Sequence, residues 1–365
     1  MSEIKVNLGE RSYVITIGSG ILSELGKIVT SAGNYTLAAV VTNPTVAAHY
    51  AQPVLDSLHS AGVRTEVITV PSGERFKTLN TVRKIYDGLI EAKMDRGGAV
   101  IALGGGVIGD MAGFAASTYM RGIDFFQVPT TLLAQVDASV GGKTGVDLPQ
   151  GKNLVGAFCQ PRAVVIDIDT LNTLPMRELR SGLAELVKHG IIYDQAFFHF
   201  VDRYASELLQ RIECPLIEAI TRSVQIKVNV VEQDEREGGL RAILNFGHTI
   251  GHAIEMLSGY GKYRHGEALA IGMVTEALLA EEMGIAEPGT VNAIAKVLAR
   301  LRLPIAMDPA LSTADIVRAI ELDKKNIGGK IRLALPIKIG ECRVFADITR
   351  DALIAAIERH GAGRL

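Results

Sequence analysis

Residues 99–110, AVIALGGGVIGD, decide the fold class, because an apolar strand, Ala99 to Leu103, leads directly into glycines. Gly104, Gly106 and Gly109 hold the three glycine places of a GxGxxG motif that follows the strand and opens a helix. Such glycines let the backbone approach a diphosphate at the helix N-terminus. The motif alone is of moderate specificity, since tight packing of a strand on a helix also requires glycine.

This motif departs from the usual Rossmann register. It does not belong to the first strand-helix unit, and the acidic residue expected at the end of the next strand is missing, because Asp124 precedes that strand. We therefore expect a dinucleotide to bind outside the standard Rossmann arrangement.

Strand and helix patterns alternate on both sides of the motif. Apolar, β-branched runs predict strands at 36–42, 64–70, 125–128 and 163–168, and residues 79–92 have the apolar spacing of a helix. Asn43-Pro44 supplies a helix cap and a first-turn proline. The order predicts an α/β fold, with a Rossmann-like, mostly parallel sheet in the N-terminal half.

The pattern changes after Leu174-Pro175. Helical periodicities follow at 182–190, 214–233, 242–258, 265–283 and 289–301, and 331–336 with 342–345 could form a small hairpin. A length of 365 residues also favours two domains. We expect an α/β domain over 1–175 and a mainly α-helical domain over 176–365; the first 35 residues and the tail after 346 contain no recognisable motif.

Composition excludes several classes of protein. Hydrophobic residues make up 48% and charged residues 21%, as in globular proteins. The net charge is −2 without blocks of like charge, which argues against nucleic-acid partners and a membrane surface. Cys159, Cys214 and Cys342 fit no disulfide framework or thiolate zinc site. With no signal peptide or membrane span in the sequence, we expect a cytoplasmic protein.

Two histidines and an acid indicate a metal site. His248 and His252 are four residues apart, hence on one helical face, and His265 follows in the next segment. Glu185 lies with Lys188 on an otherwise apolar helix, where a buried carboxylate requires a cation. Three ligands would leave an open position, as in catalytic sites. The spacing leaves open whether His248 or His252 is the ligand.

Glycines beside lysines indicate an anion site. Lys143, in residues 135–145, and Lys152 resemble a phosphate cradle, although the spacing is not that of a P-loop. Asp137 could orient a hydroxyl or balance their charge. Further cations, Arg121, Lys227, Arg241 and Lys324-Lys325, are consistent with an anionic, phosphorylated substrate, although any one of them alone would more often lie on a solvated helix face.

Seven motifs, in order between about residues 36 and 330, closely resemble the 3-dehydroquinate synthase family. They are PSGERFKT at 71–78, GGGVIGD at 104–110, PTTLLAQVDASVGGKTGV at 129–146, GKNLVGAF at 151–158, GLAELVKHG at 182–190, LNFGHTIGHA at 244–253 and HGEALAIGM at 265–273.

The resemblance implies a lyase of the shikimate pathway. This enzyme converts 3-deoxy-D-arabino-heptulosonate 7-phosphate to 3-dehydroquinate and phosphate by transient oxidation with NAD, phosphate elimination, reduction and an intramolecular aldol reaction. It implies NAD and a divalent metal, zinc or alternatively cobalt, as cofactors, a homodimer, and an N-terminal NAD-binding domain followed by a metal- and substrate-binding domain.

The resemblance also implies roles for individual residues. The metal ligands are Glu185, His248 and His265. The substrate pocket comprises Asp137, Lys143, Asn153, Lys188, Lys227, Arg241, Asn245, His252 and one lysine of the pair Lys324-Lys325, with Arg121 reaching the neighbouring subunit's active site. The dinucleotide contacts are Asn43, Ser72, Gly73, Glu74, Arg75, Phe76, Lys77, Gly106, Val107, Ile108, Gly109, Asp110, Thr130, Thr131, Lys143, Lys152, Thr170, Leu171, Asn172 and Thr173. Asn43 stands where some relatives have aspartate, which weakens its expected contact with ribose.

Three alternatives stay open at this point. Another sugar phosphate cyclase, such as a 2-epi-5-epi-valiolone synthase, would resemble this chain but tends to lose the histidine found here as His252. A metal-dependent polyol dehydrogenase of the glycerol dehydrogenase type would share the glycine turn. A relative that only binds nucleotide is disfavoured by the intact set Glu185, His248 and His265.

Overall fold

The protein is described by a computed structural model that covers residues 1–259, 261–322 and 331–363. The chain divides into two compact units, Met1–Leu174 (unit 1) and Pro175–Leu365 (unit 2). Within the described ranges, no helix is both long and apolar enough to cross a lipid bilayer.

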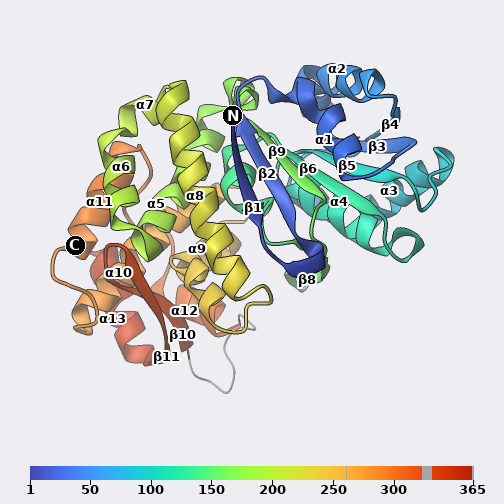
Figure 1. Ribbon diagram of the computed structural model, residues 1–365. Helices are drawn as coiled ribbons and strands as arrows, with labels where there is room; N and C mark the ends of the chain where they lie inside the picture. Colours follow the sequence, from blue (N-terminus) through green and yellow to red (C-terminus); the bar gives the residue numbers. More distant parts are fainter. Residues whose placement is uncertain (260, 323–330, 364–365) are drawn as a thin grey trace. The chain divides into compact units, whose positions relative to one another are not determined.

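Unit 1 is built on a seven-stranded sheet in the order β1-β2-β9-β6-β5-β3-β4 (Figure 1). The strands are β1 (Ser2–Val6), β2 (Tyr13–Gly18), β3 (Leu37–Thr42), β4 (Arg64–Thr69), β5 (Ala99–Gly104), β6 (Asp124–Pro129) and β9 (Ala163–Asp167). β1 pairs antiparallel with β2, and all other pairs are parallel. The predicted α/β class with a mostly parallel sheet is confirmed.

Helices cover both faces of this sheet because its strands are apolar on both sides. Ala38 and Val40 of β3 pack with α1 (Leu25–Ala32) and α2 (Pro44–Ser60). The alternate residues Ala39 and Val41 pack with α3 (Leu79–Glu91) and α4 (Gly106–Thr118). The continuous apolar runs seen in the sequence are those of buried parallel strands.

The order of the strands reverses between β3 and β5. From β3 the chain moves outward to β4 and then returns to β5 on the other side of β3. In open α/β sheets, ligands bind outside the carboxyl ends of the strands at such a switch point. Asn43 follows β3 and Gly105 follows β5, so both lie at this point.

Some elements of unit 1 were not predicted. Residues 1–35 contain β1, β2 and α1, and the glycine- and lysine-rich segment forms a separate antiparallel hairpin of β7 (Lys143–Leu148) and β8 (Gly151–Phe158). A single π-helical turn, Ala134–Ala138, precedes the hairpin.

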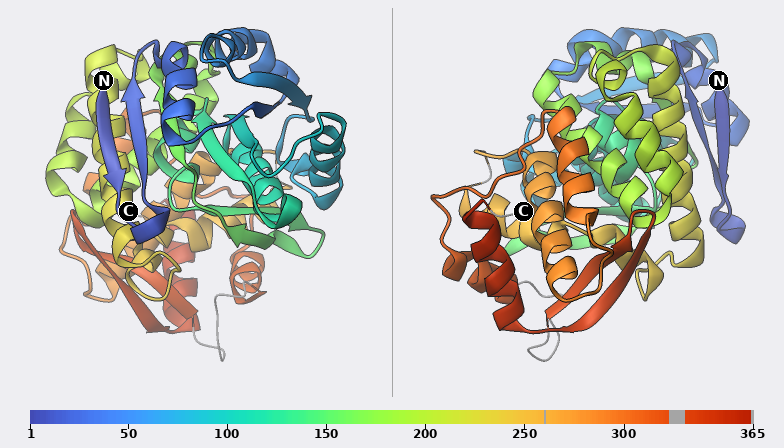
Figure 2. Two further views of the ribbon diagram at one scale, coloured as in Figure 1. Left: turned by 45° about the vertical axis from the view of Figure 1, so that its right-hand side comes forward. Right: turned by 90° about the vertical axis from the view of Figure 1, so that its left-hand side faces the viewer.

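Unit 2 is mainly helical. Its helices are α5 (Met176–Tyr193), α6 (Gln195–Arg203), α7 (Ala205–Leu209), α8 (Glu213–Gln233), α9 (His248–Leu257), α10 (His265–Glu282), α11 (Thr290–Arg300), α12 (Thr313–Leu322) and α13 (Arg350–Gly361). The predicted hairpin is present as β10 (Ile331–Lys338) and β11 (Glu341–Ile348). In Figure 2 this hairpin and α13 lie together at one end of the unit, and they share an apolar core with α9, α10 and α12.

The helix predicted over 242–258 is wrong in its first part. Residues Leu240–Asn245 form a 3-10 turn, and α9 begins only at His248. Gly247 separates the two, because its backbone is left-handed, with φ of 78°. This break places His248 at the first turn of a new helix.

Candidate metal centre and dinucleotide site

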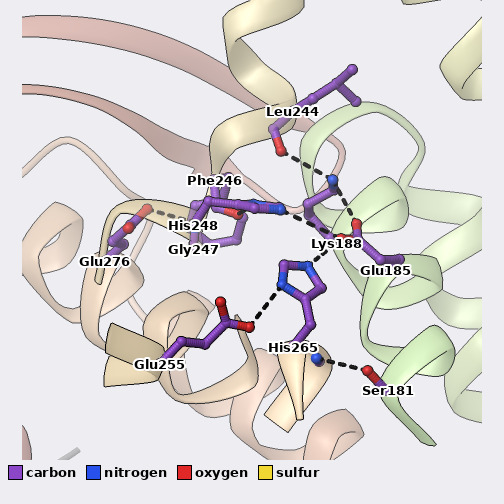
Figure 3. Close-up of polar contacts among 11 residues, drawn as sticks. Ser181, Glu185, Lys188, Leu244, Phe246, Gly247, His248, Glu255, His265 and Glu276 are labelled. Atoms are coloured by element: carbon purple, nitrogen blue, oxygen red, sulfur yellow. Dashed lines mark hydrogen bonds and ion pairs between the residues drawn. The ribbon is translucent and has the colours of Figure 1, made fainter. Parts of the chain in front are cut away.

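Three side chains from three helices of unit 2 converge on one point (Figure 3). Glu185 comes from the middle of α5, and His248 and His265 are the first residues of α9 and α10. Oε1 of Glu185 lies 3.2 Å from Nε2 of His265 and 3.4 Å from Nε2 of His248. One ligand atom from each residue lies within 4.8 Å of the others.

The approach of α5 to α10 brings Glu185 to His265. A Cβ atom on Gly266 would lie 2.1 Å from the carbonyl oxygen of Ser181, so only glycine permits this contact. The N–H of Gly266 donates to Oγ of Ser181 at 2.8 Å. Because Ser181 is one helical turn before Glu185, this contact sets the carboxylate opposite His265.

A buried carboxylate of α10 holds the start of α9. Glu276 is fully buried and accepts hydrogen bonds from the N–H groups of Gly247, at 2.6 Å, and Ile250, at 3.2 Å. The first N–H groups of a helix have no partner within the helix, and a negative charge there is favourable. Glu276 therefore fixes the turn from which His248 projects.

The remaining ring nitrogens of the two histidines face acceptors. Nδ1 of His248 lies 3.2 Å from the carbonyl oxygen of Phe246, and Nδ1 of His265 lies 3.2 Å from Oε1 of Glu255. A carbonyl or carboxylate oxygen only accepts, so each Nδ1 carries hydrogen. In neutral rings the two Nε2 lone pairs then converge with a carboxylate oxygen, and three acceptors so placed require a cation. This donor set fits a divalent metal such as zinc.

A lysine and two histidines surround the carboxylate of Glu185. Nζ of the buried Lys188 lies 2.6 Å from Oε2 of Glu185 and donates to the carbonyl oxygen of Leu244 at 3.0 Å. Burial raises the pKa of Glu185, but Lys188 and the two histidines outweigh burial and hold this pKa well below its usual range. The carboxylate is therefore ionised.

The two histidines differ in their affinity for protons. Burial and the charge of Lys188 lower the pKa of His248. Burial also lowers the pKa of His265, yet hydrogen bonds to Glu185 and Glu255 prevail and raise it to about 10. This pKa favours the doubly protonated ring of His265 when no metal is bound, and a metal bound at Nε2 would replace that proton.

Several predicted substrate residues of unit 2 lie near each other. The His252 ring centroid is 5.3 Å from that of His248 and 6.1 Å from that of His265. Lys227 is buried on α8, which packs against the 3-10 turn that holds Arg241 and Asn245. Lys324 and Lys325 lie outside the described residues.

The turn with Arg241 and Asn245 is organised by acids. Asp234 accepts hydrogen bonds from the N–H groups of Gly238 and Gly239, each at 2.7 Å, and of Arg241, at 3.0 Å. Nδ2 of Asn245 donates to Oε1 of Glu237 at 2.8 Å. These contacts hold the backbone of the turn and the side chain of Asn245 in place.

Sequence reasoning missed three acids of unit 2: Glu237, Glu255 and Glu276. A detectable signal existed for Glu276, because it is a lone acid in the apolar run of α10, as Glu185 is in α5. Glu255 is seven residues after His248, on the same helical face. Only the spacing of Glu237 gives no comparable signal.

Lys77 joins a predicted dinucleotide contact, Asp110, to a predicted substrate residue, Asn153. The Lys77 side chain is buried, and Nζ lies 2.5 Å from Oδ2 of Asp110 and donates to Oδ1 of Asn153 at 2.5 Å. The N–H of Asn153 donates to Asp147 at 2.7 Å. Burial raises the pKa of Asp110 to about 6, although Lys77 opposes this shift. The turn 74–77, α4 and the β7–β8 hairpin are thereby joined.

The carboxyl edge of the sheet has the features of a nucleotide cradle. A Cβ atom on Gly105 would lie 3.0 Å from Thr131, and one on Gly106 would lie 3.1 Å from Ala138. Within the described residues, the buried hydroxyls of Thr42 and Thr130 have no hydrogen-bond partner. Glycine backbone at the start of α4, together with hydroxyls that need partners, fits the diphosphate and ribose of a dinucleotide.

Other predicted contacts lie in turns around this edge. Asn43 caps α2, and its Oδ1 accepts the N–H of Val46 at 3.0 Å. The 3-10 turn Ile168–Thr173 is held by Tyr50, whose hydroxyl lies 2.6 Å from Oγ1 of Thr173. The remaining predicted contacts belong to three turns. The turn before α3 contains Ser72, Gly73, Glu74, Arg75 and Phe76, the first turn of α4 contains Val107, Ile108 and Gly109, and this 3-10 turn contains Leu171 and Asn172. Lys152 lies 4.0 Å from Glu74.

Of three further predicted site residues of unit 1, Asp137 and Lys143 lie in or shortly after the π-helical turn, and Arg121 lies elsewhere. Asp137 is in that turn, and Lys143 begins β7. Arg121 follows α4 and precedes β6, at the amino edge of the sheet. Because the 13 residues of α4 span about 20 Å, unit 1 separates Arg121 from its own glycine turn.

Comparisons with known proteins place this geometry in a family. The family model described as 3-dehydroquinate synthase N-terminal matches residues 67–181, and the one described as 3-dehydroquinate synthase C-terminal matches 182–326. A 3-dehydroquinate synthase from Geotalea uraniireducens is 49% identical over 359 residues, which cover 98% of this chain and 99% of that protein.

Solved structures of sugar phosphate cyclases have the same fold. A 2-epi-5-epi-valiolone synthase from Streptomyces hygroscopicus with NAD+ and Zn2+ bound gives a TM-score of 0.89 at 26% identity, with 98% of this chain and 99% of that chain covered. A 2-deoxy-scyllo-inosose synthase complexed with carbaglucose-6-phosphate, NAD+ and Co2+ gives a TM-score of 0.88 at 25% identity, with 98% and 100% covered. Identity is far higher to the 3-dehydroquinate synthase than to either cyclase, and both halves match that family's models, so the chain belongs to the 3-dehydroquinate synthase family.

Proposed function

We propose that this chain converts 3-deoxy-D-arabino-heptulosonate 7-phosphate to 3-dehydroquinate and phosphate, with Glu185, His248 and His265 as its metal ligands. The observation that carries the assignment is the convergence of Oε1 of Glu185 with the two Nε2 atoms, within 3.2 to 3.4 Å. The cofactors are NAD and a divalent metal, zinc or cobalt, as in the cyclase structures.

The metal ligands are held by the rest of unit 2. When bound, the metal would polarise a substrate hydroxyl and stabilise negative charge on its oxygen. Lys188 keeps Glu185 ionised and pointed at the histidines, and Glu276 holds the first turn of α9. His252, beside both histidine rings, is placed to hold or move a proton of the substrate.

The dinucleotide belongs to unit 1 in this proposal. NAD supplies transient hydride acceptance, so that the reaction proceeds without net oxidation. The N–H groups of the glycine turn at 104–106 would donate hydrogen bonds to the diphosphate, and Asn43, Thr130 and Thr131 would contact the nucleoside parts. Lys77 and Asp110 brace the turn 74–77 against α4.

Cations hold the phosphate of the substrate. Lys227 and Arg241 are buried, and such cations bind a dianionic group more strongly than exposed ones. The further proposed substrate contacts are Asn245 and a lysine of the pair Lys324-Lys325 from unit 2, and Asp137, Lys143 and Asn153 from unit 1. Fixed charges in an enclosed site stabilise developing charge without reorganising solvent.

We propose further that Arg121 acts in a neighbouring subunit of a homodimer. Its position at the amino edge of the sheet, opposite the glycine turn, supports this role. The Arg121→Ala chain and a Glu185→Gln chain should each be inactive but should regain activity when mixed, because one mixed site would have both residues. Absence of recovery, with dimers present by ultracentrifugation, would count against the shared site.

One assay tests the function. Purified chain supplied with the heptulosonate phosphate, NAD and zinc should release phosphate with no lasting NADH absorbance, and chelation should abolish release until zinc is restored. Lasting NADH formation with glycerol would favour a polyol dehydrogenase, and turnover of a different sugar phosphate instead would favour a different cyclase. The cytoplasmic location stays a prediction, which the three free thiols support.

A further inference from the structure

A second buried carboxylate lies beside the metal ligands. Glu255 on α9 is 5% exposed, and its Oε1 lies 3.2 Å from Nδ1 of His265. We propose that Glu255 is a positioning residue that holds His265 in the tautomer whose Nε2 can bind the metal. This inference rests on the proposed function, because it concerns a ligand of the metal that the reaction requires.

The argument begins with the two nitrogens of His265. An imidazole binds a metal through a nitrogen that has lost its proton, and the other nitrogen then carries the hydrogen. Nε2 faces Glu185 at 3.2 Å, on the side toward His248, whereas Nδ1 faces Glu255. Because a carboxylate only accepts, Glu255 accepts a hydrogen bond from the N–H of Nδ1 and keeps the hydrogen there, so that a metal bound at Nε2 takes the place of the proton that Nε2 would otherwise share with Glu185.

His248 has the same arrangement with a different acceptor. Its Nδ1 faces the carbonyl oxygen of Phe246 at 3.2 Å, so the backbone itself sets the tautomer. The acceptor of His265 is ionisable and belongs to a side chain. A charged acceptor makes the stronger hydrogen bond and increases the basicity of the ligand. Replacement of one side chain can therefore release His265 but not His248.

Helix packing fixes the position of Glu255. It is seven residues after His248, so both side chains project from the face of α9 that meets α10. The two helices approach so closely that a Cβ on Gly251 would lie 3.2 Å from the backbone of Ala268 and Leu269. The next residue, Met256, is 41% exposed and offers a matched control position.

A competing role for Glu255 is that of a metal ligand. His252, Glu255 and His265 also present ligand atoms within 4.8 Å of one another. In that case His265 would bridge two ions and lose both ring protons, and the chain would bind two ions. The positioning role requires one ion per chain, so stoichiometry separates the two.

Metal affinity provides a test that does not depend on activity. After removal of bound metal by chelation, zinc affinity is measured by competition with a chromophoric chelator, and cobalt loading by its absorption spectrum. Glu255→Gln should lower zinc affinity by roughly 10–100-fold and change the cobalt spectrum. The amide can turn its NH2 group toward Nδ1, which forces the ring hydrogen onto Nε2. Met256→Gln should behave as the unchanged chain.

Glu255→Ala distinguishes positioning from support of the fold. It removes the carboxylate without introducing a donor, so its loss of affinity should be smaller than that of Glu255→Gln. Equal loss in both variants, with reduced thermal stability of the metal-free forms, would overturn the inference. So would unchanged affinity and spectrum in Glu255→Gln, or two zinc ions in the unchanged chain. If the unchanged chain binds no zinc, the proposed function fails as well.

Discussion

Two clusters of charged side chains, the Lys77 group of unit 1 and the Glu185–His248–His265 group of unit 2, differ in where their compensating charge comes from. In unit 1, Lys77 is a buried cation whose ammonium group contacts Asp110 and Asn153, so the chain supplies both charges. In unit 2, Glu185, His248 and His265 direct three acceptors at one another once the rings are neutral, and the chain supplies Lys188 for only one oxygen of Glu185. The first group is a compensated ion pair that braces the proposed dinucleotide site, whereas the second group requires a bound metal ion.

The largest effect should follow from breaking the second group. Glu185→Gln removes the charge that holds the metal, so zinc content should fall from about one per chain to near zero. Turnover should fall by roughly a thousandfold or more, since a catalytic metal contributes several kcal/mol to the transition state. Metal analysis and phosphate release measure the two effects.

The control is an acid on the same helix. Glu178 pairs with Arg264 at 2.8 Å near the surface, and Glu178→Gln should keep both zinc and turnover. Circular dichroism must show that Glu185→Gln folds, because Lys188 loses its buried partner. A folded Glu185→Gln chain with full zinc and activity would refute the ligand assignment.

Breaking the first group should affect stability and leave the metal in place. Lys77→Met leaves the half-buried Asp110 without its cation, and since removal of one partner of a fully buried pair costs about 3–5 kcal/mol, the loss of unfolding free energy here should be up to about 3 kcal/mol. Urea titration measures this loss, and zinc affinity measured in parallel should stay unchanged.

A double variant tests whether the unpaired charge of Asp110 causes this loss of stability. Lys77→Met combined with Asp110→Asn removes both charges and should recover most of the lost stability. If the double variant is no more stable than Lys77→Met alone, the charge pair is not the cause. Weaker NAD binding is expected in both, because the turn 74–77 loses its brace.

The sequence was most informative where apolar residues form a continuous run or repeat with a simple period. The strands of the parallel sheet are continuous apolar runs, such as 99–103, and they were predicted for this reason. The β7–β8 hairpin escaped prediction because KTGVDL and GKNLVGAF mix glycine, charge and partly exposed residues without clear alternation. β1 and β2 form an edge hairpin whose pairing with β9 joins residues about 150 positions apart.

The same limit applies to the metal centre. Glu185 was found because an acid in an apolar helix requires a partner. The spacing of the histidines indicated His265 with either His248 or His252, and the family motifs favoured His248. Glu276 gives the same signal but meets backbone N–H groups 26 and 29 residues away. Sequence spacing does not show that kind of partner. Positioning groups were therefore missed where the contact depends on how helices pack.

A smaller effect should follow from Glu276→Gln. The glutamine oxygen can accept only part of what the carboxylate accepts from Gly247 and Ile250, and its NH2 group would face a donor. We expect a loss of about 1–3 kcal/mol in unfolding free energy and weaker zinc binding. Glu282→Gln, which loses a surface pair with Arg359, should change stability by less than about 0.5 kcal/mol. Equal losses in both variants would contradict the capping role.

The smallest effect concerns pH and tests whether Asp110 in the unit 1 group still takes up a proton. The pKa of Asp110 is about 6 in the folded chain and near its ordinary value when unfolded, so the folded state binds this proton more tightly. The resulting stability is present at low pH and is lost as pH rises through the folded pKa. Relative to Asp110→Asn, which cannot titrate, the unchanged chain should lose about 1 kcal/mol between about pH 5 and pH 7. Urea titrations of both chains at the two pH values measure this difference. A constant difference, or one of opposite sign, would mean that Lys77 outweighs burial; the unit 1 group would then be a fully compensated ion pair rather than one that still takes up a proton.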